Sequence, residues 1–71
     1  MNSEAMTPDQ VKQARKTLRL NQAQMAQMLG YGAQARVSDV ERGAHPLDRG
    51  KERLLQAYLS GYRPPDWPSH S

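Results

Sequence analysis

The sequence predicts a small all-α protein, a compact bundle of four short helices with room for a fifth. Two observations lead to this fold class. Apolar residues recur three and four positions apart along four segments, as on one face of an α-helix, and residues that start or end helices bound each segment. No segment shows the polar–apolar alternation of a β-strand. A chain of 71 residues has room for one domain with a small core.

The first helix is expected over residues 8–19, after a disordered N-terminus of residues 1–6. Thr7 can accept a backbone N–H, Pro8 suits the first helical position, and Gln10 completes a capping box. The inward face of this helix carries Val11, Ala14, Arg15 and Leu18. Its outer faces carry three basic residues to which we assign no site, Lys12, Lys16 and Arg19.

The second and third helices are short and follow closely. The second is expected over residues 22–29, with Asn21 and Gln24 forming a capping box at its start. Gly30 ends it, because glycine readily adopts the left-handed conformation past a helix end. The third is expected over residues 33–42 and is mostly polar. Its apolar anchors and terminating glycine are Val37, Val40 and Gly43.

The fourth helix is expected over residues 49–60, with Asp48 as its cap and Gly61 at its end. It is amphipathic, and its inward face carries Leu54, Leu55, Tyr58 and Leu59. Residues 7–61 therefore form the predicted domain.

The C-terminal tail, residues 62–71, holds three of the five prolines and the only tryptophan, so it is expected to be non-helical. Trp67 has two interpretations. It can fold back to cover the small core, or the tail can contact a second subunit or another protein.

Composition excludes several classes of site. The chain has no cysteine, so it has neither disulfides nor thiolate metal sites, and its two histidines, His45 and His70, are far apart in sequence. We expect no metal and no cofactor. No paired carboxylates, nucleophile–base set or phosphate-binding glycine loop points to an enzyme. No apolar run is long enough for a membrane span, so a cytoplasmic protein without a membrane partner is expected. The net charge of +3 is compatible with a nucleic-acid partner.

Two short helices joined by a glycine-containing turn, the second too polar to be buried, outline a helix-turn-helix. The residues that carry a closer resemblance are Arg15, Gln22, Met25, Ala26, Leu29, Gly30, Val37, Val40, Glu41, Arg42 and Gly43. In this register the chain resembles the Cro/C1-type (XRE-family) DNA-binding domains over about residues 8–60. The resemblance implies a lambda-repressor-like bundle with a central helix-turn-helix that binds double-stranded DNA.

The resemblance also implies which residues contact bases. Six residues separate Gly30 from Val37, one more than the family pattern, so the positions are counted back from Val37. They fall on Gln34, Ala35, Arg36, Ser38 and Asp39. Arginine can bond both acceptors of guanine, glutamine can bond adenine bidentately, and an alanine methyl can meet that of thymine.

Two side chains in this region, Asp39 and Tyr31, each have two interpretations. Asp39 can accept from a cytosine amine, or it can orient Arg36 three residues earlier on the same helix face, which we favour. Tyr31 can plug the core at the turn, or its hydroxyl can donate to a phosphate.

The remaining implied contacts support the third helix. By resemblance, Arg15 and Glu41 form an ion pair, and Gln22 braces Gln34. Phosphate contacts are expected from Gln22, Arg42, His45 and Arg49.

The expected function is that of a small transcriptional regulator, a repressor acting as a homodimer on a pseudo-palindromic operator with helix 33–42 in the major groove. Two alternatives remain open. One is the antitoxin of a toxin–antitoxin pair, with the tail folding onto the toxin. The other is a protein-interaction module that does not bind DNA.

Overall fold

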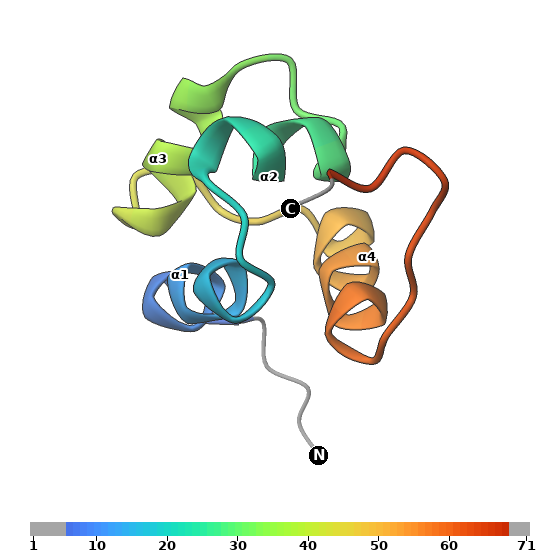
Figure 1. Cartoon of the computed structure of the whole chain (residues 1–71). Coiled ribbons are helices and arrows are strands. Elements are labelled where there is room, and N and C mark those ends of the chain that lie inside the picture. The colour runs from blue at the N-terminus through green and yellow to red at the C-terminus, as the bar shows by residue number, and fades with distance from the viewer. Residues whose placement is uncertain (1–5, 69–71) are drawn as a thin grey trace.

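The computed structural model describes residues 6–68, and within that range the chain folds into four helices around one core (Figure 1). Their bounds are Pro8–Thr17 for α1, Gln22–Leu29 for α2, Gln34–Glu41 for α3 and Arg49–Leu59 for α4. The described part contains no strand. The predicted all-α class and helix order are confirmed. None of the described helices combines the length and apolar character needed to cross a bilayer.

The first two helices begin with the predicted capping boxes. Thr7 Oγ1 accepts from the backbone N–H of Gln10 at 3.1 Å, and Gln10 Oε1 accepts from that of Thr7 at 2.9 Å. Asn21 and Gln24 exchange the equivalent bonds at 2.7 and 2.9 Å. These bonds satisfy backbone donors that a helix start leaves unpaired, and they fix where α1 and α2 begin.

The capping prediction for α4 is wrong in one respect. Asp48 occupies the N-cap position, but its side chain makes no capping hydrogen bond. Its Oδ2 atom instead lies 3.7 Å from Lys51 Nζ, one turn into the helix. The nearby cation offers the carboxylate an ionic partner in place of the backbone amides.

The first helix is shorter than predicted. It ends at Thr17 with Leu18 as its cap, so Arg19 lies beyond the helix and not on its outer face. Arg19 has a φ of 61°, in the left-handed region. The turn then leads through the buried Leu20 into α2.

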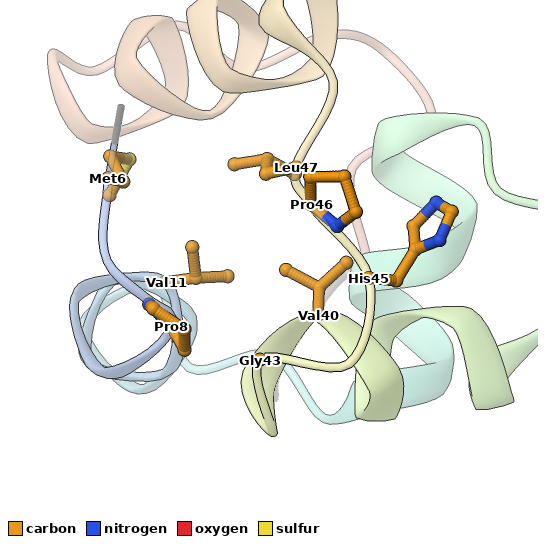
Figure 2. A pocket seen from close by; sticks show the side chains of 8 residues that line it. All are labelled: Met6, Pro8, Val11, Val40, Gly43, His45, Pro46 and Leu47. Carbon is orange, nitrogen blue, oxygen red and sulfur yellow. The ribbon is translucent and has the colours of Figure 1, made fainter. Parts of the chain in front are cut away.

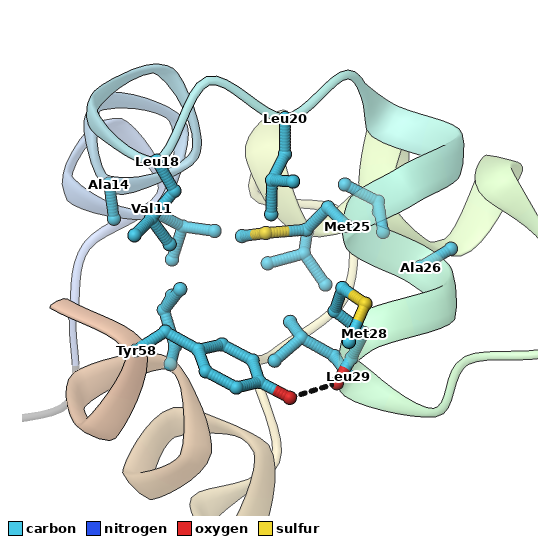
Figure 3. Close-up of a cluster of buried hydrophobic side chains, with 12 residues drawn as sticks. Val11, Ala14, Leu18, Leu20, Met25, Ala26, Met28, Leu29 and Tyr58 are labelled. Carbon is cyan, nitrogen blue, oxygen red and sulfur yellow. Dashed lines mark hydrogen bonds between the residues drawn. The ribbon is translucent and has the colours of Figure 1, made fainter. Parts of the chain in front are cut away.

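The core collects apolar side chains from all four helices and from the turn after α1 (Figure 3). Its largest fully buried members are Val11, Met25, Val37 and Leu55. Tyr58 closes one side, where its hydroxyl donates to the backbone oxygen of Met28 at 2.7 Å.

The inward face predicted for α4 is partly wrong. Leu55 and Tyr58 are buried, but Leu54 is half-buried and Leu59 is 41% exposed. Tyr58 makes the contact with α2, whereas Leu59, the next residue and the last of α4, does not belong to the core.

Met6, expected to belong to the disordered N-terminus, is bonded to the folded domain. The backbone N–H of Met6 donates to Glu52 Oε2 on α4 at 2.9 Å, and Glu52 is only 6% exposed. This bond joins Met6 to the folded domain and gives the buried carboxylate of Glu52 a hydrogen-bond partner. The rest of the segment expected to be disordered, residues 1–5, lies outside the described residues.

The tail up to Pro68 is non-helical, as predicted, and runs along α4 on the side of the molecule opposite α3 (Figure 1). Trp67 packs against the core, with its ring edge-on to Tyr58 at a centroid distance of 4.9 Å. Arg63 donates to the backbone oxygens of Tyr58 and Tyr62 at 2.7 and 2.8 Å, and its guanidinium lies 4.4 Å from the Trp67 ring centre. These contacts favour the interpretation in which the tail covers the core. His70 and the rest of residues 69–71 lie outside the described range.

Candidate nucleic-acid interface

The turn of residues 31–33 joins α2 to α3 and leaves the first turn of α3 exposed. Val37 and Val40 anchor α3, with 1% and 3% of their surface exposed. The three residues before Val37 are exposed, namely Gln34, Ala35 and Arg36, whereas Ser38 and Asp39 are half-buried. The side chains predicted to contact bases therefore project from one end of a helix whose other face is fixed in the core.

A buried ion pair joins α1 to the end of α3, as the resemblance implied. Arg15 Nε lies 2.6 Å from Glu41 Oε2, and Arg15 Nη2 donates to Glu41 Oε1 at 3.2 Å. The two side chains are only 14% and 5% exposed. Arg15 Nη1 also donates to the backbone oxygen of Leu20 at 3.0 Å. The guanidinium thus ties α1, the turn after it and α3 together.

The ion pair continues as a chain of hydrogen bonds to the surface. Gln22 Nε2 donates to Glu41 Oε1 at 3.1 Å, and Gln34 Nε2 donates to Gln22 Oε1 at 3.4 Å. An ionised carboxylate only accepts, so the nitrogen of Gln22 faces Glu41 and its oxygen faces Gln34. Gln34 in turn keeps its Oε1 atom and one N–H free of this chain. The series Arg15–Glu41–Gln22–Gln34, which we call the relay, sets the orientation of an exposed amide.

Arg36 has a different partner from the predicted one. Asp39 pairs with Arg42, three residues later, and not with Arg36. An acidic residue on the N-terminal side of its basic partner suits the helix dipole better than the reverse order. Arg36 Nη1 instead lies 3.2 Å from His45 Nδ1. A guanidinium has no acceptor, so this ring nitrogen must accept the hydrogen bond.

Of the two interpretations of Tyr31, the structure favours the plug at the turn. It packs against the core, and its hydroxyl oxygen is buried with no hydrogen-bond partner among the described residues. Burial, and secondly the negative charge of Asp48, raise the pKa of Tyr31 above its usual value. Lys51 Nζ lies 5.0 Å from the centre of its ring. A hydroxyl buried in this way cannot reach a phosphate outside the molecule.

Two hollows border this region. The first, of about 240 Å³, lies under the loop that carries His45 and is lined mainly by apolar side chains, among them Met6, Val11 and Leu47 (Figure 2). Among the residues that the structure describes, His45 is the only titratable side chain that lines it. The second, also of about 240 Å³, opens at the start of α3 between the turn, Arg36 and Asp39.

The predicted site residues therefore fall into separate groups. The relay joins one group, and two further pairs join Arg36 to His45 and Asp39 to Arg42. Arg49 is exposed, and within residues 6–68 its side chain makes no hydrogen bond or ion pair with these groups. Ala35 is also exposed, and its methyl group has no atom that could join them. The Arg36–His45 contact could not be found from sequence, because it depends on how the loop after α3 folds back.

Neither a protein-family model, nor a curated protein, nor a solved structure matches the chain. Function is therefore inferred from its residues and their geometry.

Proposed function

We propose that the protein binds double-stranded DNA in a sequence-specific manner, with α3 in the major groove, as a small regulator of the Cro/C1 type. The major groove is wide enough for an α-helix and displays a distinct set of hydrogen-bonding groups for each base pair. The first turn of α3 offers polar side chains to such a surface while its valines hold the helix in place.

The observation that carries the proposal is the relay. Ordering an exposed glutamine reduces its conformational freedom, which opposes folding unless other contacts compensate. The same ordering favours binding, because less freedom is lost when a rigid ligand arrives. Gln34 is held through Gln22 by a buried ion pair. Its free oxygen and N–H match the N6 amine and N7 atom of adenine.

Arg36 supplies the second base contact. Its bond to His45 ties the guanidinium to the loop that follows α3. Further N–H donors of the guanidinium are left for the two acceptors of guanine. Around it, Arg42, His45 and Arg49 provide groups for the phosphates, which fix the position of the protein without reading sequence. The net charge of +3 favours this contact through the release of counterions.

We further propose that two copies bind a pseudo-palindromic operator and repress by occupying a promoter. A two-fold dimer sets two recognition helices about 34 Å apart, one turn of DNA. Leu59, the last residue of α4, and Tyr62, in the tail that follows, are 41% and 53% exposed. They offer apolar surface for the second subunit.

The test is a binding titration on a duplex selected from a random-sequence pool, with a random duplex for comparison. Arg36→Ala should weaken the selected duplex by about 5- to 150-fold, which corresponds to ~1–3 kcal/mol, and leave random DNA almost unchanged. Arg53→Ala, an exposed arginine of α4 outside the site, is the matched control. Full affinity of the Arg36 variant would show that α3 is wrongly placed in the groove. A wild-type protein with no salt-dependent affinity for any duplex would rule out DNA binding.

A further inference from the structure

All four described helices end with the same backbone motif, which places one residue in the left-handed conformation. In α1 alone this residue is not glycine. In each, a backbone N–H beyond the helix bonds a carbonyl five residues earlier, at 2.8–3.1 Å. The residue before that N–H has a positive φ. Three of these residues are glycines at 85°, 80° and 113°, namely Gly30, Gly43 and Gly61. The fourth is Arg19 at 61°, the only non-glycine residue with positive φ between residues 6 and 68.

An arginine is disfavoured at this position. In the left-handed conformation the Cβ atom crowds the following carbonyl oxygen, and glycine avoids this because it has no Cβ. The side chain of Arg19 does not offset the strain within the fold, because it is exposed and makes no ion pair or hydrogen bond with the described residues. Favourable charge at the end of α1 is already supplied by Arg15 and Lys16 in its last turn.

Arg19 stands close to the proposed interface. The next residue, Leu20, accepts a hydrogen bond from Arg15, the first member of the relay. Three residues on is Gln22, the first residue of α2 and the third member of the relay. The Cα atoms of Arg19 and Gln22 can therefore be no more than about 11 Å apart. A cation at this point lies close to the start of α2, and the positive end of the helix dipole there also attracts anions.

We propose that Arg19 binds a backbone phosphate of the duplex that α3 reads, which rests on the proposed DNA-binding function. A guanidinium can give a phosphate two parallel hydrogen bonds, and its planar fork makes it well suited to that ligand. The turn, held by two backbone hydrogen bonds and by Arg15, fixes where the side chain leaves the surface. The contact is independent of sequence and adds to affinity for any duplex.

Arg19→Gly separates stability from binding. Removing the Cβ relieves the backbone, so the midpoint of thermal unfolding should rise by several degrees. Affinity should fall equally for selected and random duplexes. The slope of log affinity against log salt should become shallower by about 0.9, equivalent to about 3.5-fold between 50 and 200 mM salt. Arg19→Asn, which tolerates the left-handed conformation but carries no charge, should give the same slope.

Lys12→Gln is the matched control, since it removes an exposed positive charge from α1. It should keep the wild-type slope, and an equal change would overturn the proposal in favour of a general charge effect. A wild-type slope in both Arg19 variants would also overturn it. So would an Arg19→Gly protein no more stable than wild type, because the strain would then be absent. If the wild-type protein binds no duplex at all, both this proposal and the proposed function fail. The other outcomes leave the proposed function intact.

Discussion

Replacing Glu41 with glutamine tests the ion pair on which the relay depends. The carboxylate is 5% exposed and accepts hydrogen bonds from Arg15 Nε, Arg15 Nη2 and Gln22 Nε2. Glutamine has nearly the same shape but only one accepting oxygen and no charge. The substitution therefore removes at least one charge-assisted bond and leaves the largely buried Arg15 cation without its counter-charge.

The expected loss of stability is large for this protein. Breaking a buried ion pair by removing one partner costs about 3–5 kcal/mol. Since Arg15 keeps some contact with water, at 14% exposure, we expect the lower end, about 3 kcal/mol. A chain of this length has a total stability of roughly 4–11 kcal/mol. The midpoint of thermal unfolding should fall by at least about 12 °C.

The assay is urea unfolding followed by circular dichroism, for wild type, Glu41→Gln, Arg15→Gln and the double variant. If the pair acts as a unit, the double variant should be more stable than the sum of the single losses predicts, by about 1–3 kcal/mol. If Glu41→Gln is mostly unfolded, the Arg15→Gln variant still tests the pair, because it removes the other partner and leaves the Glu41 carboxylate unpaired. A Glu41→Gln protein within about 0.5 kcal/mol of wild type would refute the reasoning, since that is the range of an exposed pair.

Three further predictions concern the opposite side of the molecule. Burial, followed by the charge of Asp66, raises the pKa of Tyr58, so the folded protein holds the phenol proton more tightly than the unfolded chain. This contribution to stability is complete below about pH 10 and is lost as pH rises further. Urea unfolding at about pH 9 and 11 should therefore show a smaller fall in stability for Tyr58→Phe than for wild type. That variant should also lose about 1 kcal/mol at pH 7, because Met28 loses its donor. Trp67→Ala should cost about 2 kcal/mol in the same assay, and unchanged stability would show that the tail does not support the core.

Features that depend on neighbours in sequence were predictable. The capping boxes at Thr7 and Asn21 involve residues three apart, so the sequence contains both partners of each bond. The ion pair of Arg15 with Glu41 spans 26 residues and followed only from a resemblance, not from spacing. The structure adds the direction of the next hydrogen bond, in which Gln22 donates to Glu41.

Features that depend on loop paths or on competition between partners were not predictable. Asp39 has an arginine three residues away on either side, Arg36 and Arg42, and the prediction favoured Arg36, whereas the structure pairs Asp39 with Arg42. The bond from Met6 to Glu52 joins residues 46 apart and needs the finished fold. Arg19 was misplaced for a different reason. Nothing in its residue type signals a left-handed turn, so the helix was extended through it.

The packing of Trp67 makes the tail an intrinsic reporter. The chain has one tryptophan, and its ring lies against Tyr58 and under the Arg63 guanidinium. Its fluorescence therefore follows the docking of residues 62–68, while circular dichroism follows the helices. Coincident transitions by the two probes would indicate that tail and bundle unfold as one cooperative unit. Since α3 lies on the far side of the molecule, the same signal reports folding without direct interference from a ligand bound there (Figure 1).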